Sequence, residues 1–177
     1  MRQQSRVTPW IFAAIVLAMM TAIGVFVSNA STSPVMSPAS QVVSTRAADG
    51  QLHFRVLDVQ RKLPQLGDDH YGATPQGSYT VVTLAVRNTG DTIATFDGAY
   101  VVGLDAQGHR VTADRDATAL VNDDAIGRLT RIAPGSRITT KVAFDVAPGE
   151  RLTEAQVHDS VFSRGAGLRL APERQVP

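Results

Sequence analysis

The sequence predicts an all-β fold: an antiparallel β-sandwich, preceded by an N-terminal hydrophobic helix and a flexible linker. Two patterns support this prediction. Between residues 49 and 171, apolar and polar residues alternate in short stretches, and Gly, Asp and Pro separate these stretches. Ahead of them lie one unbroken apolar run and a segment rich in Ser, Thr, Ala and Pro. About seven to nine short strands joined by such turns are typical of a sandwich.

Residues 1–28 are expected to hold a cytoplasmic N-terminus and a transmembrane anchor or signal segment. The run from Trp10 to Val27 is uncharged, and Arg2 and Arg6 precede it. Export machinery recognises this pattern and keeps the positive end in the cytoplasm. The predicted location is therefore the cytoplasmic membrane, crossed once, with the C-terminal domain outside. The apolar side chains of this segment include Trp10, Ile11, Phe12, Ile15, Leu17, Val25, Phe26 and Val27.

The same segment is compatible with cleavage after Ala30, which would give a secreted protein. Ser28 and Ala30 are small residues at the positions that a signal peptidase prefers. A retained anchor is favoured because the run of 18 residues exceeds a usual signal core of roughly 7–15 residues. Trp10 also suits the membrane interface.

Residues 29–48 are predicted to be a disordered linker. Ser, Thr, Ala and Pro dominate this stretch, and it has no aromatic residue. Such a composition buries too little apolar surface to offset the entropy of ordering. Pro34 and Pro38 stiffen it locally. Its expected role is to hold the folded domain away from the membrane.

Composition excludes several classes of function. The chain has no cysteine, which rules out disulfides, a thiol nucleophile and a lipidated Cys anchor. Without Arg2 and Arg6, the exported part carries 15 basic and 16 acidic residues. A nearly neutral domain does not have the net charge expected of a nucleic-acid-binding protein, so no nucleic-acid partner is expected.

The first half of the predicted sandwich, residues 49–171, contains three extended stretches. Gln51–Val59 changes the phase of its apolar residues at Leu57, which indicates a β-bulge or a crossing between sheets. Tyr79–Arg87 is rich in β-branched residues on both phases and is expected to be buried. Asn88–Asp91 supplies turn residues, and Thr92–Phe96 resumes an extended structure.

The second half contains the clearest strand of the chain, Arg137–Val146, whose apolar and polar residues alternate. Asp114–Ala133 has no firm period and is expected to contain a helical turn. Residues 172–177 form a tail. The other predicted strands are Tyr100–Asp105 and Arg110–Ala113, joined by a hairpin turn at 106–108, and then Val157–Phe162 and Leu168–Leu170.

Several short structural motifs resemble one known family. They are Tyr71–Val82, Val86–Asp91, Val102–Gly108, Ile132–Gly135 and Val142–Pro148. Together they are similar to the telokin-like domain of unknown function on actinobacterial and firmicute surface proteins, catalogued as domain of unknown function 4352. The resemblance implies an immunoglobulin-like sandwich, similar in fold to a small secreted mycobacterial antigen, and an extracytoplasmic location. It implies no catalytic or cofactor-binding residue. Many relatives attach through a lipidated Cys, which this chain lacks.

No arrangement of residues in the sequence indicates an enzyme or a cofactor. The histidines His53, His70, His109 and His158 are widely spaced. The neighbours His158, Asp159 and Ser160 would project alternately from a strand, so they cannot form a hydrogen-bonded triad. We therefore expect no catalytic residue, no cofactor and a non-enzymatic protein.

Weak candidates for calcium ligands are Asp114, Asp116 and Asp124, because hard carboxylate oxygens on loops suit this ion. The alternative is that these aspartates cap turns by accepting hydrogen bonds from nearby backbone amides. The sequence favours the second interpretation, since the spacing departs from a calcium-binding loop. No metal site is therefore expected.

The function predicted from the sequence is a non-catalytic module displayed at the cell envelope. Its partner would be another surface protein or a cell-wall component, bound through loops or an exposed sheet edge. Candidate loops are Lys62–Gly77, which carries Tyr71, and Asp114–Arg131. The alternatives are a structural or secreted antigen-like protein after signal cleavage and, more distantly, a calcium-binding surface domain. The membrane is contacted through the N-terminal helix.

Trp10 makes the fate of the N-terminal segment measurable, because it is the only tryptophan in the chain. Protein purified from the envelope of its host is expected to show tryptophan emission, since a retained anchor keeps residue 10. Emission from tyrosine alone would show cleavage and overturn the prediction of an anchor.

Overall fold

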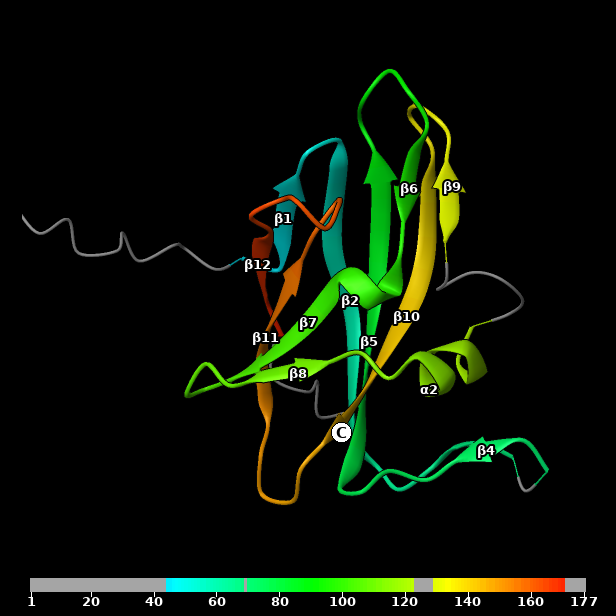
Figure 1. The fold of residues 1–177 in the computed structure, drawn as a ribbon, viewed down its shortest axis with the longest axis vertical. Helices are drawn as coiled ribbons and strands as arrows, with labels where there is room; N and C mark the ends of the chain where they lie inside the picture. The colour runs from blue at the N-terminus through cyan, green and yellow to red at the C-terminus, as the bar shows by residue number, and fades with distance from the viewer. Residues whose placement is uncertain (1–43, 69, 123–128, 171–177) are drawn as a thin grey trace, which may run out of the picture. The chain divides into compact units, whose positions relative to one another are not determined.

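The computed structural model describes residues 44–68, 70–122 and 129–170 (Figure 1). The predicted anchor, the cleavage position after Ala30, the linker up to residue 43 and the tail 172–177 lie outside the described residues. Among the residues that are described, no helix has the length and apolar character needed to cross a membrane.

The elements follow one another along the chain as short strands with two helical turns. In order they are β1 (Arg46–Asp49), β2 (Leu52–Leu63), β3 (Leu66–Gly67), β4 (Gly72–Ala73), β5 (Ser78–Asn88), β6 (Ala94–Phe96), the 3-10 helix η1 (Gly98–Tyr100), β7 (Val101–Asp105), β8 (Arg110–Thr112), α2 (Arg115–Leu120), β9 (Thr130–Ile132), β10 (Arg137–Val146), β11 (Leu152–Val157) and β12 (Ala166–Arg169).

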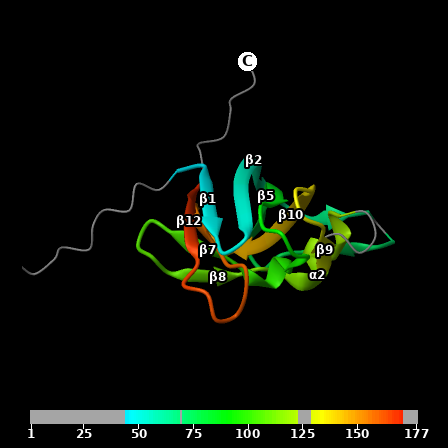
Figure 2. The ribbon, with the colours of Figure 1, turned by 90° about the horizontal axis from the view of Figure 1, so that it is seen from above.

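Two four-stranded sheets form the two layers of an antiparallel sandwich, as the sequence predicted. One sheet has the strand order β1-β2-β5-β10 and the other β12-β11-β7-β8. Seen from above, β2 and β5 lie in one layer and β7 and β8 in the other (Figure 2). Two small pairs, β3–β4 and β6–β9, lie outside these sheets. All strand pairs are antiparallel.

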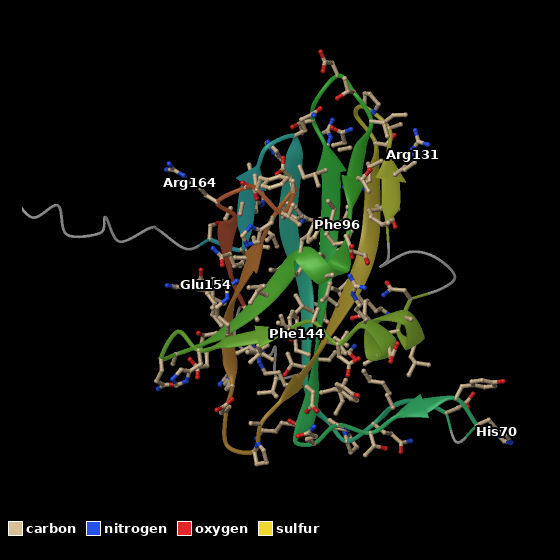
Figure 3. The ribbon with its side chains drawn as sticks, viewed as in Figure 1. His70, Phe96, Arg131, Phe144, Glu154 and Arg164 are labelled. Atoms are coloured by element: carbon tan, nitrogen blue, oxygen red, sulfur yellow. The ribbon has the colours of Figure 1, made fainter. Side chains whose placement is uncertain are left out.

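The core lies between the two sheets because each strand turns every second side chain inward. Phe54, Leu84 and Phe144 enter it from the first sheet, and Leu152 enters from the second; all four are almost completely buried. Phe96, the last residue of β6, packs on Phe54 with ring centroids 6.3 Å apart. Figure 3 shows Phe96 and Phe144 within the sandwich.

Most of the predicted strands are confirmed. β10 has the predicted bounds, and β5 extends the predicted Tyr79–Arg87 by one residue at each end. The phase change at Leu57 is a break in the β2–β5 register between Val56 and Asp58, which is the expected bulge. The region Asp114–Ala133 contains the expected helical turn, α2.

The prediction of a strand over Val157–Phe162 was wrong. β11 ends at Val157, and the chain then turns back into β12. The Asp159 amide donates to an Asp49 carboxylate oxygen at 2.7 Å, and the Ser163 amide donates to the Ser160 carbonyl oxygen at 3.2 Å. These bonds define a turn, which leaves Val161 and Phe162 in solvent.

The folded domain also begins earlier than the predicted boundary at residue 49. β1 occupies the last residues of the predicted linker and pairs along the edge of β2. Upstream of β1, the Thr45 and Ser44 carbonyl oxygens accept hydrogen bonds from the Val56 and Arg169 amides. The sequence gives little sign of this strand, because an edge strand held by backbone bonds needs no apolar alternation.

A second, smaller apolar cluster covers one part of the outer face of the β1-β2-β5-β10 sheet. Its buried members are Leu66, Tyr79, Val81, Ala117 and Ala143, contributed by β3, β5, α2 and β10. Elements α2 and β4 lie toward the lower right of Figure 1. On the rest of this outer face most side chains are exposed, although Ala85 is buried.

Helix α2 also caps the free edge of β10. The Thr118 hydroxyl accepts from the Ala143 amide at 3.0 Å, and the Asn122 side-chain oxygen accepts from the Lys141 amide at 2.8 Å. These bonds satisfy amides that would otherwise be available to another chain. The edge of the sheet is thus blocked at this position.

A buried asparagine, Asn88, ties together four segments at one end of the sandwich. Its side-chain nitrogen donates to the Thr92 and Ile132 carbonyl oxygens at 2.6 and 2.9 Å, and its side-chain oxygen accepts from the Gly90 amide at 2.9 Å. Its backbone amide donates to the Ser136 carbonyl oxygen at 3.0 Å. Asn88 therefore fixes the turn after β5 and holds the end of β9 and the β9–β10 turn beside it.

Substitution Asn88→Ala is expected to lower the free energy of unfolding by about 3 kcal/mol, measured by urea denaturation. The change removes three hydrogen bonds and leaves buried carbonyl oxygens without a donor. The neighbouring Thr89→Ala serves as a control, because Thr89 is exposed and a surface substitution typically changes stability by about 0.5 kcal/mol or less. Equal losses in both variants would contradict the role assigned to Asn88.

Candidate functional site

The uncovered part of the outer face of the β1-β2-β5-β10 sheet gathers basic side chains from all four strands. We call this surface the basic face. All of its members are exposed, and they are Arg46, His53, Arg55, Arg87, Arg137 and Lys141.

The register of the sheet makes these residues neighbours. Arg46 lies opposite Arg55, and Arg87 lies opposite both His53 and Arg137. Neighbouring strands are about 4.8 Å apart, and residues two apart on one strand about 7 Å. Arg46 and Arg55 thus form one cross-strand row, and His53, Arg87 and Arg137 form the next. Residues far apart in the sequence therefore make one continuous surface.

Nothing in the described part of the chain neutralises this surface. None of its members forms an ion pair with a carboxylate of the described residues. The same outer face carries an acidic residue, Asp58, in a different cross-strand row. In that row Asp58 of β2 lies opposite Thr83 of β5, and Lys141 of β10 lies on the other side of Thr83. The rows that contain the arginines have no acidic member.

This arrangement opposes stability, because like charges directly opposite each other in a sheet are destabilising. The outer face of the second sheet differs. There Glu154 lies opposite Arg169, and the Arg110 guanidinium donates to the Gln156 side-chain oxygen at 2.8 Å. The second sheet therefore places opposite charges across from each other, whereas the first sheet places like charges across from each other.

The sequence does not reveal the basic face through its net charge, because net charge does not show where the charged residues lie. Positive and negative residues nearly balance, but they are segregated in space. A signal was present: Arg55, Arg87 and Arg137 all occupy the outward phase of predicted strands. Only the strand order and register place them side by side.

The aspartates proposed as weak calcium ligands do not come together around one point in the described residues. Asp114 is the N-cap of α2: one carboxylate oxygen accepts from the Ala117 amide at 2.9 Å and the other from the Tyr79 hydroxyl at 3.3 Å. Asp116 is exposed in the first turn of α2, and Asp124 lies outside the described residues. Burial and the nearby Asp114 carboxylate raise the pKa of Tyr79 to about 12.

One group of potential metal ligands consists of Asp105, His109 and Glu150, whose ligand atoms lie within 4.8 Å of one another. Asp105 accepts hydrogen bonds from the Gln107 and His109 amides, each at 2.8 Å, and contacts His109 Nδ1 at 2.8 Å. Burial raises the pKa of Asp105, but these hydrogen bonds outweigh it and hold the pKa below its usual value. The geometry is that of a stabilised β7–β8 turn.

A cleft of about 460 Å³ lies beside β8, and acidic residues contribute to its lining. Asp145 in this lining accepts from the Gln76 and Gly77 amides at 2.7 and 3.1 Å, and Asp114 caps α2. Glu150 is the remaining acid and is exposed. Two of the three acidic side chains of this cleft, Asp114 and Asp145, therefore hold the fold together.

The remaining candidates from the sequence are separated in space. His158 Nδ1 contacts the Ser163 hydroxyl at 3.2 Å, whereas Asp159 packs against Gly50. His53 belongs to the basic face, and His70 lies at the tip of the β3–β4 hairpin (Figure 3). That hairpin also exposes Tyr71.

Comparison with known proteins identifies the family. A family model described as a domain of unknown function, DUF4352, matches residues 43–167. The chain belongs to this family. No curated protein is detectably similar in sequence. The resemblance inferred from the sequence motifs is thus confirmed, and the match begins close to β1.

The DUF4352 domain is similar in structure to several solved proteins. The secreted protein MPT63 from Mycobacterium tuberculosis is 16% identical, with a TM-score of 0.50, and the match covers 71% of this chain and 90% of MPT63. The YjhA protein from Bacillus subtilis is 11% identical, with a TM-score of 0.52 and coverage of 73% and 98%.

A putative lipoprotein from Bacillus subtilis, YcdA, is 15% identical, with a TM-score of 0.53. The match covers 72% of this chain but only 38% of that protein. The DUF4352 domain thus spans well under half of the lipoprotein. At these identities the likeness shows a shared fold.

Reversing one charge on the basic face is expected to stabilise the DUF4352 domain. Arg87→Glu replaces repulsion from Arg137 by attraction, which should raise the free energy of unfolding by about 0.5 kcal/mol at low salt and by less at high salt. Arg169→Glu is the matched control, because it places a second carboxylate opposite Glu154 and should lower stability. Destabilisation of both variants at low salt would contradict the charge segregation.

Proposed function

We propose that the DUF4352 domain is a non-catalytic binding module that acts outside the cytoplasmic membrane and binds an anionic component of the envelope through the basic face. The observation that carries this proposal is the row of unpaired cations on a bare sheet surface. The fold tolerates a repulsive arrangement there, although the outer face of its second sheet places Glu154 opposite Arg169. A surface whose arrangement of charges lowers the stability of the fold is typical of a functional surface.

The chemistry of the basic face suits phosphate or carboxylate groups presented repeatedly. Arginine binds either group through two parallel hydrogen bonds from its planar guanidinium. The cations lie on a pleated surface with spacings of about 5 and 7 Å. Such a surface fits an extended anionic polymer, or the acidic surface of another envelope protein, better than it fits one small molecule.

The proposed location rests on the N-terminal segment and is supported by the comparisons. The uncharged run Trp10–Val27 behind Arg2 and Arg6 predicts export and a single membrane crossing. The similar structures include a secreted protein and a putative lipoprotein. Cleavage after Ala30 would release the same module with the same basic face.

The proposed absence of catalysis is supported by the polar residues that line the cleft beside β8. Asp114 and Asp145 accept backbone amides, so they act as structural groups. His158, Asp159 and Ser160 do not form a relay. A binding module needs no such relay.

The test is the salt-dependent binding of the full chain, in detergent, to long-chain inorganic polyphosphate as a model polyanion. Replacing Arg55, Arg87 and Arg137 together by Gln is expected to weaken binding. Each lost phosphate contact should also reduce the slope of log affinity against log salt concentration by roughly 0.7, so the triple variant should lose about 2.

The matched control replaces Arg131, Arg151 and Arg169 by Gln, which removes three exposed arginines from other surfaces. This control should retain the affinity of the unmodified chain. Its slope of log affinity against log salt concentration should differ by less than the roughly 0.7 expected for one phosphate contact. Equal weakening by the two triple variants would show that only net charge matters. No binding by the unmodified chain at low salt would also overturn the proposal.

A further inference from the structure

The turn between β11 and β12 exposes two adjacent apolar side chains. Val161 is 64% exposed and Phe162 is 95% exposed. A phenylalanine in this state keeps almost its whole ring in water. The two side chains belong to neither apolar cluster of the domain. We call Val161 and Phe162 the apolar tip.

The backbone of this turn is held in a defined conformation. The Asp159 amide donates to a carboxylate oxygen of Asp49, the last residue of β1, at 2.7 Å. Ser163 closes the turn onto Ser160 and contacts His158. The apolar tip is therefore displayed by a supported hairpin.

Independently of the basic face, we propose that the apolar tip inserts into the interfacial region of the membrane that carries the chain's own N-terminal segment. This inference shares with the proposed function the prediction that Trp10–Val27 is a retained anchor. It adds a second contact with the bilayer, which sets the orientation of the domain.

The position where the chain enters the domain supports the membrane as the partner of the apolar tip. Ser44 bridges Leu168 of β12, and Leu168 is six residues from Phe162, a distance of at most about 20 Å along the strand. Residues 28–43 separate the predicted anchor from Ser44, and 16 residues span at most about 55 Å. The tip is thus confined near the bilayer, at an effective concentration in the millimolar range.

The residues around the tip favour a lipid surface over a protein partner. Arg164, two residues after Phe162, projects away from the sandwich (Figure 3), where its guanidinium can bind lipid phosphates. Ser160 and Ser163 flank the apolar pair, and Asp159 follows β11 closely. A stable protein interface needs about 800 Å² on each side, whereas two side chains at a polar turn suit shallow insertion.

The apolar tip and the basic face belong to different sheets. The tip joins two strands of the β12-β11-β7-β8 sheet, and the basic face covers the outer side of the other sheet. Weak insertion of the tip is sufficient to orient the domain, because the anchor already holds the domain near the bilayer.

The test uses the absence of cysteine from the chain. Full-length Val161→Cys, labelled with an environment-sensitive fluorophore, is reconstituted into vesicles of phosphatidylglycerol and phosphatidylcholine. We expect the label to emit at shorter wavelength than in detergent-free buffer and to be quenched by lipids that carry a spin label near the glycerol backbone. Gln107→Cys provides a control, because it labels an exposed position on the β7–β8 turn and should remain in water.

A second variant isolates the contribution of the ring. Adding Phe162→Ser to labelled Val161→Cys should abolish the quenching and return the emission to that of the Gln107 position. Trp10 emission in the same vesicles reports separately whether the N-terminal segment is embedded. If Trp10 is quenched while the label at residue 161 remains in water, insertion of the tip is overturned. Polyphosphate binding by the basic face is unaffected by either outcome.

Discussion

The side chain of Asn88 is the interaction on which the arrangement of the DUF4352 domain depends most. It is fully buried at the end of β5 and bonds to the turn that follows and to the end of β9. Its backbone holds the β9–β10 turn, so β10 starts in a fixed register against β5. That register puts Arg137 opposite Arg87. The polar contact that closes one end of the sandwich thus also positions the centre of the basic face.

The outer face of the β1-β2-β5-β10 sheet is divided into two parts with different physical roles. In one part, Tyr79 and Val81 bury apolar surface under α2 and the β3–β4 hairpin, and this adds stability. In the other part, like charges face each other across strands without cover. A face that only needed to be soluble would mix both signs of charge. The two rows that contain the arginines instead create a field that attracts anions over several ångströms.

Sequence patterns predicted the fold wherever burial alternates along a strand. Arg137–Val146 is such a case, and so is the bulge at Leu57, because a change of phase must appear as a change of register. The sequence patterns failed where hydrogen bonds to the backbone, and not the burial of side chains, decide the structure. β1 lacks an apolar pattern because its edge pairing uses main-chain bonds, and Val161 and Phe162 resemble a strand although the Asp159–Asp49 contact ends it. The second of these contacts joins residues that are 110 positions apart in the chain.

The sequence by itself determined the family, the antiparallel sandwich and the prediction of export, because these depend on local periodicity and on the uncharged N-terminal run. Only the tertiary structure decided where the charges meet. A composition of nearly equal basic and acidic residues contains no information about which strands are neighbours. Strand order and register bring Arg46, Arg55, Arg87 and Arg137 onto one surface. Electrostatic interactions depend on distance in space, so the candidate binding surface exists only once the chain has folded.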